Sequence, residues 1–267
     1  MAEIDDGQRP GGDETAPPGA SRTWKEAVAV IAALFVILAV GAGAGMLASR
    51  GFEISVGANR PSARPGGALE TLNAAQLSVF LGGFQIASIV LTMAIAPFFA
   101  RPQQSLLPFG WPRRALLVIA ASTLALFLIM LTFGSMVYLF DREALVSDIK
   151  PFADMAQTRA WWALLIAAGV GAPIAEELLF RGLIFGVLRN TRLGLIGTLM
   201  TTATLWSALH MQYSLYGLIA IFFIGLYLGW LRERTGSLIP PIVCHALYNG
   251  TIVVALAKFT GPGFAAS

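Results

Sequence analysis

Residues 160–190 read AWWALLIAAGVGAPIAEELLFRGLIFGVLRN, an apolar run with two adjacent glutamates and an arginine in its interior. About 20 apolar residues suffice to cross the hydrocarbon core of a bilayer, so this run predicts a membrane-spanning helix. Because the run is longer than a simple span, we expect it to tilt or to continue into a turn at the membrane surface. Charged groups inside hydrocarbon cost roughly 2.5–3.5 kcal/mol each on insertion scales, so they indicate a functional site by default.

The composition of the whole chain agrees with a membrane location. Hydrophobic residues make up 56% of the 267 residues and charged residues 12%, and the mean hydropathy is +0.71. A soluble domain carries about twice that share of charged residues. Apolar runs of about the required length occur at residues 27–48, 74–99, 115–140, 160–190, 193–210, 215–231 and 240–257. The sequence therefore predicts an all-α fold, a polytopic integral membrane helical bundle of about seven transmembrane helices.

The basic residues predict the orientation of this bundle. With the N-terminus in the cytoplasm, the majority of the 18 lysines and arginines fall on the cytoplasmic side, as the positive-inside rule requires. The clearest case is the loop with Arg101, Arg113 and Arg114, which contains no acidic residue. We therefore expect a multi-pass protein of the cell membrane with a cytoplasmic N-terminus and with membrane lipid as a partner. The basic residues form no stripe, so we do not expect nucleic acid as a partner.

The two glutamates of residues 160–190 face different directions on a helix. Glu177 and Arg181 are four residues apart, in the acid-before-base order that favours an ion pair on one helix face. Glu176 is rotated by about 100° from Glu177, so it lacks that partner. Burial pushes the pKa of an unpaired carboxyl group upward, which suits a general base or acid near neutral pH. Glu176 is therefore the candidate for proton transfer.

The chain has two histidines, and both lie in apolar runs. Trp206 and His210 are four residues apart, as are His245 and Asn249, so each pair is expected to share one face of its helix. Counting a rise of about 1.5 Å per residue from the predicted cytoplasmic turns, we expect the histidines and Asn249 to approach Glu176 once the helices tilt. The sequence therefore predicts one buried polar cavity that is reached from the cytoplasmic side.

Other interpretations of these residues stay open. A membrane histidine often makes only a structural hydrogen bond, and Glu177 with Arg181 is as readily a structural pair as a functional one. Ser207 and His210 could form a nucleophile and base, but no G-x-S-x-G surrounds the serine. The single cysteine, Cys244, diverges from the adjacent histidine on a helix, which favours a buried inert thiol. Together the polar residues favour a functional site, because the other long apolar runs have no ionisable residue in their interiors.

Three short motifs occur in this order: E-E-x-x-x-R (Glu176, Glu177, Arg181), aromatic-x-x-x-H (Trp206, His210) and H-x-x-x-N (His245, Asn249). Their order and spacing resemble those of the CAAX prenyl protease and bacteriocin-processing family of intramembrane glutamic or metalloproteases. The resemblance covers roughly a third of the chain, about residues 169–253. It implies an α-helical membrane core with a polar cavity that opens toward the cytosol.

The resemblance also implies catalytic roles. In that family the first glutamate and the histidine of the second motif are thought to activate a water molecule for attack on a peptide carbonyl, which corresponds to Glu176 and His210. The third motif is thought to stabilise the oxyanion, which corresponds to His245 and Asn249. The remaining motif residues support this geometry: Glu177, Arg181 and Trp206.

The resemblance leaves two points open. Trp206 stands where phenylalanine is usual in that family, which keeps an aromatic wall but narrows the cavity. Zinc is a candidate cofactor, because two histidines and two carboxylates are a reasonable donor set. If zinc is bound, we expect Glu176, His210 and His245 as its ligands. We favour a mechanism without metal or cofactor, because pairing with arginine removes the second glutamate as a ligand and no H-E-x-x-H motif is present.

We expect four parts in the chain: a disordered N-terminal tail (1–23), rich in Gly, Pro and acidic residues, N-terminal transmembrane helices and loops (24–158), a catalytic transmembrane core that resembles this family (159–258) and a short C-terminal tail (259–267). We expect an intramembrane endopeptidase that cleaves a peptide, a membrane protein or a prenylated CAAX-type substrate near the cytoplasmic face. Two alternatives stay open. One is a non-catalytic immunity or regulatory membrane protein, and the other is a proton-coupled transporter that uses the Glu/His cluster as a relay.

Overall fold

The computed structural model describes residues 22–55, 74–102, 104–158 and 161–259, and all regular secondary structure in these ranges is helical. The α-helices are α1 (Trp24–Ser55), α2 (Ala74–Phe99), α3 (Ala115–Phe140), α4 (Arg142–Ala156), α5 (Trp161–Ile166), α6 (Ala172–Glu176), α7 (Phe185–Leu188), α8 (Gly194–Ala208), α9 (Leu215–Thr235) and α10 (Ile239–Phe259). Two π-helical segments are η1 (Ala167–Gly171) and η2 (Glu177–Ile184). The predicted all-α fold class is confirmed.

Within the described ranges, six helices are long and apolar enough to cross a membrane. They correspond to six of the predicted runs, and the remaining run, 193–210, contains α8. Because α8 has 15 residues, it is about 22 Å long and falls short of the roughly 30 Å hydrocarbon core. The observed bundle is therefore roughly consistent with about seven transmembrane helices.

The long run at 160–190 contains one 28-residue span, Trp161–Leu188, that changes its helical winding twice. Its regular α-helical pieces are separated by η1 and η2. Pro173, at the start of α6, has no N–H to donate to the preceding turn, so the α-helical pattern cannot pass through it unbroken. The length of the run predicts a tilt or a surface turn, and the structure shows π-helical winding in addition. In a π-helical segment, successive side chains are rotated about the helix axis by a different angle than in a uniform α-helix. Short π segments often occur at functional sites.

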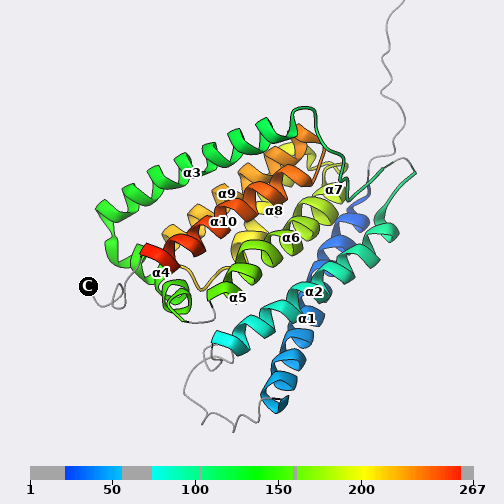
Figure 1. The fold of residues 1–267 in the computed structure, drawn as a ribbon. Helices are drawn as coiled ribbons and strands as arrows, with labels where there is room; N and C mark the ends of the chain where they lie inside the picture. Colours follow the sequence, from blue (N-terminus) through cyan, green and yellow to red (C-terminus); the bar gives the residue numbers. More distant parts are fainter. Residues whose placement is uncertain (1–21, 56–73, 103, 159–160, 260–267) are drawn as a thin grey trace, which may run out of the picture.

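The helices form three groups side by side (Figure 1). The hairpin of α1 and α2 lies along one side, α3 lies along the opposite side, and α5–α10 lie between them. Close contact in the hairpin requires small residues, since a Cβ atom on Gly45 would lie 2.7 Å from the backbone oxygen of Phe80. In the central group, α8 packs against α9 at Gly225, where a Cβ atom would lie 3.1 Å from Cα of Ala203.

The predicted N-terminal tail joins the fold at its end. Residues 1–21 lie outside the described residues, but Arg22 is buried and its backbone N–H donates to the carbonyl of Asn190. Its guanidinium donates to the carbonyl of Phe99 and to Gln104 and pairs with Glu26. Arg22 and Thr23 are therefore part of the bundle rather than of a disordered tail. Of the predicted C-terminal tail, Phe259 is the last residue of α10 and residues 260–267 lie outside the described residues.

The amphipathic helix α4 covers the other end of the central span, where α5 begins. Asp141 caps its N-terminus by accepting a hydrogen bond from the backbone N–H of Ala144. The buried side of α4 packs against α5 and α10, in a small cluster that contains Ala153, Ala156, Leu164, Val253 and Leu256. The two ends of Trp161–Leu188 are thus closed differently, one by the Arg22 contacts and the other by α4.

Candidate functional site

Trp206 of α8 lies among the polar residues and contacts members of all three motifs. Its indole Nε1 donates a hydrogen bond to Oε2 of Glu176, with 2.8 Å between the two atoms. The rings of His210 and His245 stand nearly perpendicular to the indole, each with its centroid 5.5 Å away. The guanidinium carbon of Arg181 lies 4.6 Å from the indole centroid, within cation–π range. Trp206 is buried, so these contacts form inside the protein.

Glu177 and Arg181 form the predicted ion pair at the start of η2. Nη1 of Arg181 donates to Oε1 of Glu177 over 2.9 Å, and both residues are fully buried. Nη2 of Arg181 donates to the backbone carbonyl of Gly225, which ties η2 to α9. Removing one partner of such a pair leaves an uncompensated charge in a low-dielectric interior, which costs about 3–5 kcal/mol. The pair therefore fixes the helix that carries the catalytic candidates.

His245 of α10 lies against the same carboxylate. Its Nδ1 is 3.0 Å from Oε1 of Glu177, and because a carboxylate can only accept, Nδ1 carries the proton. The other ring nitrogen, Nε2, lies 3.2 Å from the amide nitrogen of Asn249, which also donates to the carbonyl of Ala168. Nε2 is then the acceptor in this arrangement. The predicted pair of His245 and Asn249 on one helix face is present, and Glu177 is its unpredicted neighbour.

His210 does not lie on α8 as expected, because that helix ends at Ala208 and His210 belongs to the following turn. Its Nδ1 is 2.9 Å from the backbone carbonyl of Trp206. A carbonyl oxygen accepts only, so Nδ1 carries the proton and Nε2 of the neutral ring keeps a free lone pair. The ring contacts Trp206 despite leaving the helix, so the predicted contact is present although the helical reason for it is wrong.

Glu176 is half-buried and has a partner that the spacing did not predict. As expected, Glu176 does not pair with Arg181 in the described structure. Its carboxylate instead accepts a hydrogen bond from the indole N–H of Trp206, which belongs to another helix. Its neighbour Glu177 is fully buried and accepts from both Arg181 and His245. The two adjacent carboxylates thus have different surroundings. Glu177 is fully buried in an ion pair, and Glu176 is half-buried against an indole.

Sequence reasoning missed two residues near this site. Tyr213, in the same turn as His210, lies with its ring centroid 6.0 Å from that of the histidine. Burial raises the pKa of its phenol, and the charge of Asp148 adds to the shift, so Tyr213 is neutral at physiological pH. Gln85 of α2 donates to the carbonyl of Ala167 in η1, next to the segment that leads to Glu176. The sequence signal for the Gln85 contact was a glutamine inside the predicted span 74–99, and the structure shows this side chain buried.

The residues named for zinc do not gather into a metal site. Across the described ranges, no three His, Cys, Asp or Glu side chains lie close enough together to hold an ion. Glu176 instead contacts an indole, and Nε2 of His245 lies against the amide nitrogen of Asn249. The described geometry does not fit a zinc ion bound by these side chains, and no step below passes through a metal. The preference for a mechanism without a cofactor, with zinc as the possible alternative, stays a prediction.

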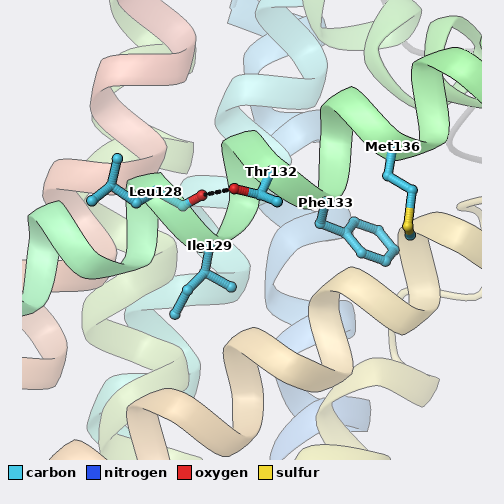
Figure 2. Close-up of a pocket in the computed structure, with 5 residues that line it drawn as sticks. All are labelled: Leu128, Ile129, Thr132, Phe133 and Met136. Atoms are coloured by element: carbon cyan, nitrogen blue, oxygen red, sulfur yellow. Dashed lines mark hydrogen bonds between the residues drawn. The ribbon is translucent and has the colours of Figure 1, made fainter.

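Two apolar hollows lie along α3, away from the polar cluster. One is lined by Leu128, Ile129, Thr132, Phe133 and Met136 (Figure 2). Its single polar side chain, Thr132, donates its hydroxyl to the carbonyl of Leu128 on the same helix. The other hollow shares Ile129 and Phe133 and is bounded by Phe223 and Tyr227 of α9. Neither hollow is lined by a carboxylate or an imidazole, so the candidate site is the cluster around Trp206.

Comparison with known proteins identifies the same part of the chain. Residues 158–251 match the family model described as Type II CAAX prenyl endopeptidase Rce1-like. The "Uncharacterized 24.3 kDa protein" of Escherichia coli is 36% identical over 84 residues, which cover 30% of this chain and 38% of that protein. The match thus spans well under two thirds of this relative. No solved structure matches.

The family match confirms the resemblance that the three motifs carry, over residues 158–251. The family that this segment resembles is described as one of CAAX prenyl endopeptidases. Together with six apolar helices of spanning length, this match indicates a multi-pass membrane protein.

Proposed function

We propose that this protein is an intramembrane endopeptidase in which Glu176 and His210 activate a water molecule for attack on a peptide carbonyl. The observation that supports this assignment is the shared contact with Trp206, which binds the carboxylate through Nε1 and packs against the imidazole ring. The carboxylate and the free Nε2 lone pair of His210 are both proton acceptors. Trp206 therefore holds two proton acceptors close to one rigid side chain, which suits general-base catalysis.

The reaction then proceeds in two steps. The oxygen of water bonds to the carbonyl carbon while its proton passes to Glu176 or to Nε2 of His210. The C–N bond breaks next, and the same proton goes to the leaving nitrogen, so the products are a carboxylic acid and an amine. General acid–base catalysis of this kind typically contributes about 10²–10⁴-fold to the rate.

His245 and Asn249 are proposed to stabilise the oxyanion. In the described geometry Nε2 of His245 accepts a hydrogen bond from Asn249, so it has no proton to give an oxyanion. Protonation of Nε2 makes it a donor and ends that contact, which frees one N–H of Asn249 for the same oxyanion. Glu177 Oε1, 3.0 Å from Nδ1, stabilises the resulting imidazolium. A fully preorganised oxyanion donor is worth about 3–4 kcal/mol in a water-excluded site, and the contribution here is smaller by the cost of protonating Nε2 and of breaking its contact with Asn249.

The proposed substrates are peptides, including prenylated C-a-a-X peptides and segments of membrane proteins, cleaved near the cytoplasmic face of the cell membrane. The cytoplasmic orientation is supported by the basic loop with Arg113 and Arg114, both exposed near the end of the bundle where Arg22 binds. The opposite end is covered by α4. Because α4 covers that end, we propose that the substrate enters from the basic side, with membrane lipid as the surrounding partner.

A reconstituted cleavage assay tests the proposal. The wild-type protein in lipid nanodiscs is given an internally quenched farnesylated peptide that ends in C-a-a-X, and in parallel the same peptide without the farnesyl group. We expect release of the three C-terminal residues by wild type and loss of this activity in Glu176→Gln, which keeps the size of the side chain. Cleavage of both peptides broadens the substrate class. Equal cleavage by the variant would contradict the role of Glu176.

A further inference from the structure

The turn that carries His210 has a partner outside the three motifs, the amphipathic helix α4. This turn joins α8 to α9, and its short internal hydrogen bonds run from His210 to Ser207 and from Tyr213 to His210. The His210 ring also contacts Trp206, through Nδ1 and by packing of the two rings. Proton transfer needs a closely fixed side chain, and a turn of a few residues gains rigidity from contacts with neighbouring elements. The contacts from α4 therefore add to those that hold His210.

Asp148 of α4 binds this turn with both carboxylate oxygens. Oδ1 accepts from the backbone N–H of Ser214 over 2.6 Å, and Oδ2 accepts from the hydroxyl of the same serine over 2.7 Å. Charge-assisted hydrogen bonds are shorter and about twice as strong as neutral ones, and two of them fix direction as well as distance. Ser214 in turn caps α9 by accepting from the N–H of Gly217. One carboxylate thus fixes the residue at which the turn ends.

A second contact from α4 reaches the histidine through an aromatic ring. Phe152, one turn after Asp148, stacks on Tyr213 with a centroid distance of 6.1 Å. Tyr213 then packs against His210 at 6.0 Å. Gly217 lies against the same carboxylate, because a Cβ atom built there would collide with Oδ2 of Asp148. The helix α4 therefore packs closely against the turn that carries His210 and against the start of α9.

We propose that Asp148 is a positioning residue, which holds the 209–214 turn so that Nε2 of His210 points to the reacting water. The role of this turn in catalysis rests on the proposed function, whereas the contacts by which Asp148 holds the turn do not. Asp148 does not touch the motif residues by any described hydrogen bond and acts through Ser214 and Tyr213. It lies in a segment that the family match, which begins at residue 158, does not cover.

Three variants and one control separate positioning from a general loss of structure. Asp148→Ala removes both acceptors, whereas Asp148→Asn keeps an oxygen for the N–H of Ser214 and a polar group for its hydroxyl. Gly217→Ala places a methyl group against the carboxylate of Asp148, which must then move. The matched control is Asp154→Ala, which removes a carboxylate from the same helix, where it is 61% exposed and pairs only with Lys150.

The first measurement is cleavage of the quenched farnesylated peptide. We expect kcat to fall on the order of 10- to 100-fold in Asp148→Ala, the range for a misplaced catalytic group, with little change in KM. Gly217→Ala should shift in the same direction, Asp148→Asn should recover most of the activity, and Asp154→Ala should match wild type. A change in KM with kcat unaltered, or equal losses in Asp148→Ala and Asp154→Ala, would overturn the proposal.

The second measurement does not depend on activity. The chain has two histidines, so ¹⁵N-histidine labelling gives two imidazole signal sets, which a His210→Asn variant assigns. In Asp148→Ala we expect the His210 signals to shift or broaden while those of His245 stay in place. Unchanged His210 signals would overturn the inference, and changes in both sets would indicate unfolding and overturn it as well. A selective His210 change in a protein that cleaves no peptide would keep the positioning role and refute the proposed function.

Discussion

Nε1 of Trp206 donates a 2.8 Å hydrogen bond to Oε2 of Glu176, which joins α8 to the end of α6. Because an indole has one N–H and no acceptor, this bond gives the carboxylate a fixed direction without giving it a proton. The indole also packs against both histidines, so the orientation of the proposed base and of its neighbours depends on one side chain.

Replacing this side chain separates its two contributions. Trp206→Phe removes the donor but keeps an aromatic face for Arg181, so we expect kcat to fall about 10-fold, the equivalent of about 1.4 kcal/mol, with small effect on folding. Trp206→Leu also removes the face that contacts the guanidinium and should lower thermal stability as well. Peptide cleavage and thermal unfolding in detergent check the two effects. Wild-type kcat in Trp206→Phe would show that the indole N–H has no catalytic importance.

Breaking the buried ion pair should cost far more stability than breaking an exposed one. Arg181→Leu leaves Glu177 charged and fully buried next to His245, and we expect a loss of about 3–5 kcal/mol. The control is Lys150→Leu, which breaks the exposed i,i+4 pair with Asp154 and should cost less than about 1 kcal/mol. Denaturant unfolding in mixed micelles compares the two. Similar losses of unfolding free energy in the two variants would mean that the buried Glu177–Arg181 pair matters no more for folding than the exposed pair.

Two glycines of α1 should respond oppositely to alanine. A Cβ atom on Gly45 would lie 2.7 Å from a backbone oxygen of α2, so Gly45→Ala must separate the hairpin and lower the melting temperature. A Cβ atom on Gly43 meets nothing within 4 Å. Gly43→Ala should therefore be neutral or stabilising, by up to about 1 kcal/mol of helix propensity. Thermal unfolding of the two variants tests the packing of α1 on α2, which an equal response would contradict.

The proposed orientation can be tested by thiol labelling in intact cells. Cys244 is buried, so the wild-type chain should give a low background. Arg113→Cys and Ser147→Cys place exposed thiols before α3 and on α4. With a cytoplasmic N-terminus, a membrane-impermeant maleimide should label the thiol at 147 in intact cells and the thiol at 113 only after lysis. The reverse pattern would invert the topology.

The parts of the site that could be predicted from the sequence are those that depend on contacts within one helix. Glu177 with Arg181 and His245 with Asn249 are four residues apart, a spacing that favours contact on one helix face, and the first pair keeps this contact although η2 winds as a π-helix. The contact of Trp206 with Glu176 was not predicted in this form, because it joins two helices whose relative rotation depends on packing. For the same reason, no sequence pattern indicated that Glu177 would receive both Arg181 and His245.

Local winding could not be predicted from the sequence either. Apolar length predicts the span at 160–190, but a hydrophobicity pattern does not distinguish α-helical from π-helical turns, so η1 and η2 were not foreseen. The end of α8 before His210 was missed because no proline or glycine marks it, and the helix gives way to a turn that α4 holds from outside. Contacts between segments distant in the chain, such as Asp148 with Ser214, lie beyond any local pattern.

The most direct test of the central claim works without an identified substrate. Protein N-termini are compared in native-host cells that express wild type or Glu176→Gln at matched membrane levels. We predict new N-termini that are present only with wild type, and these would identify the substrate and its cleavage site. Identical profiles, in cells where wild type still produces its phenotype, would contradict proteolysis and favour a regulatory, immunity or transport role.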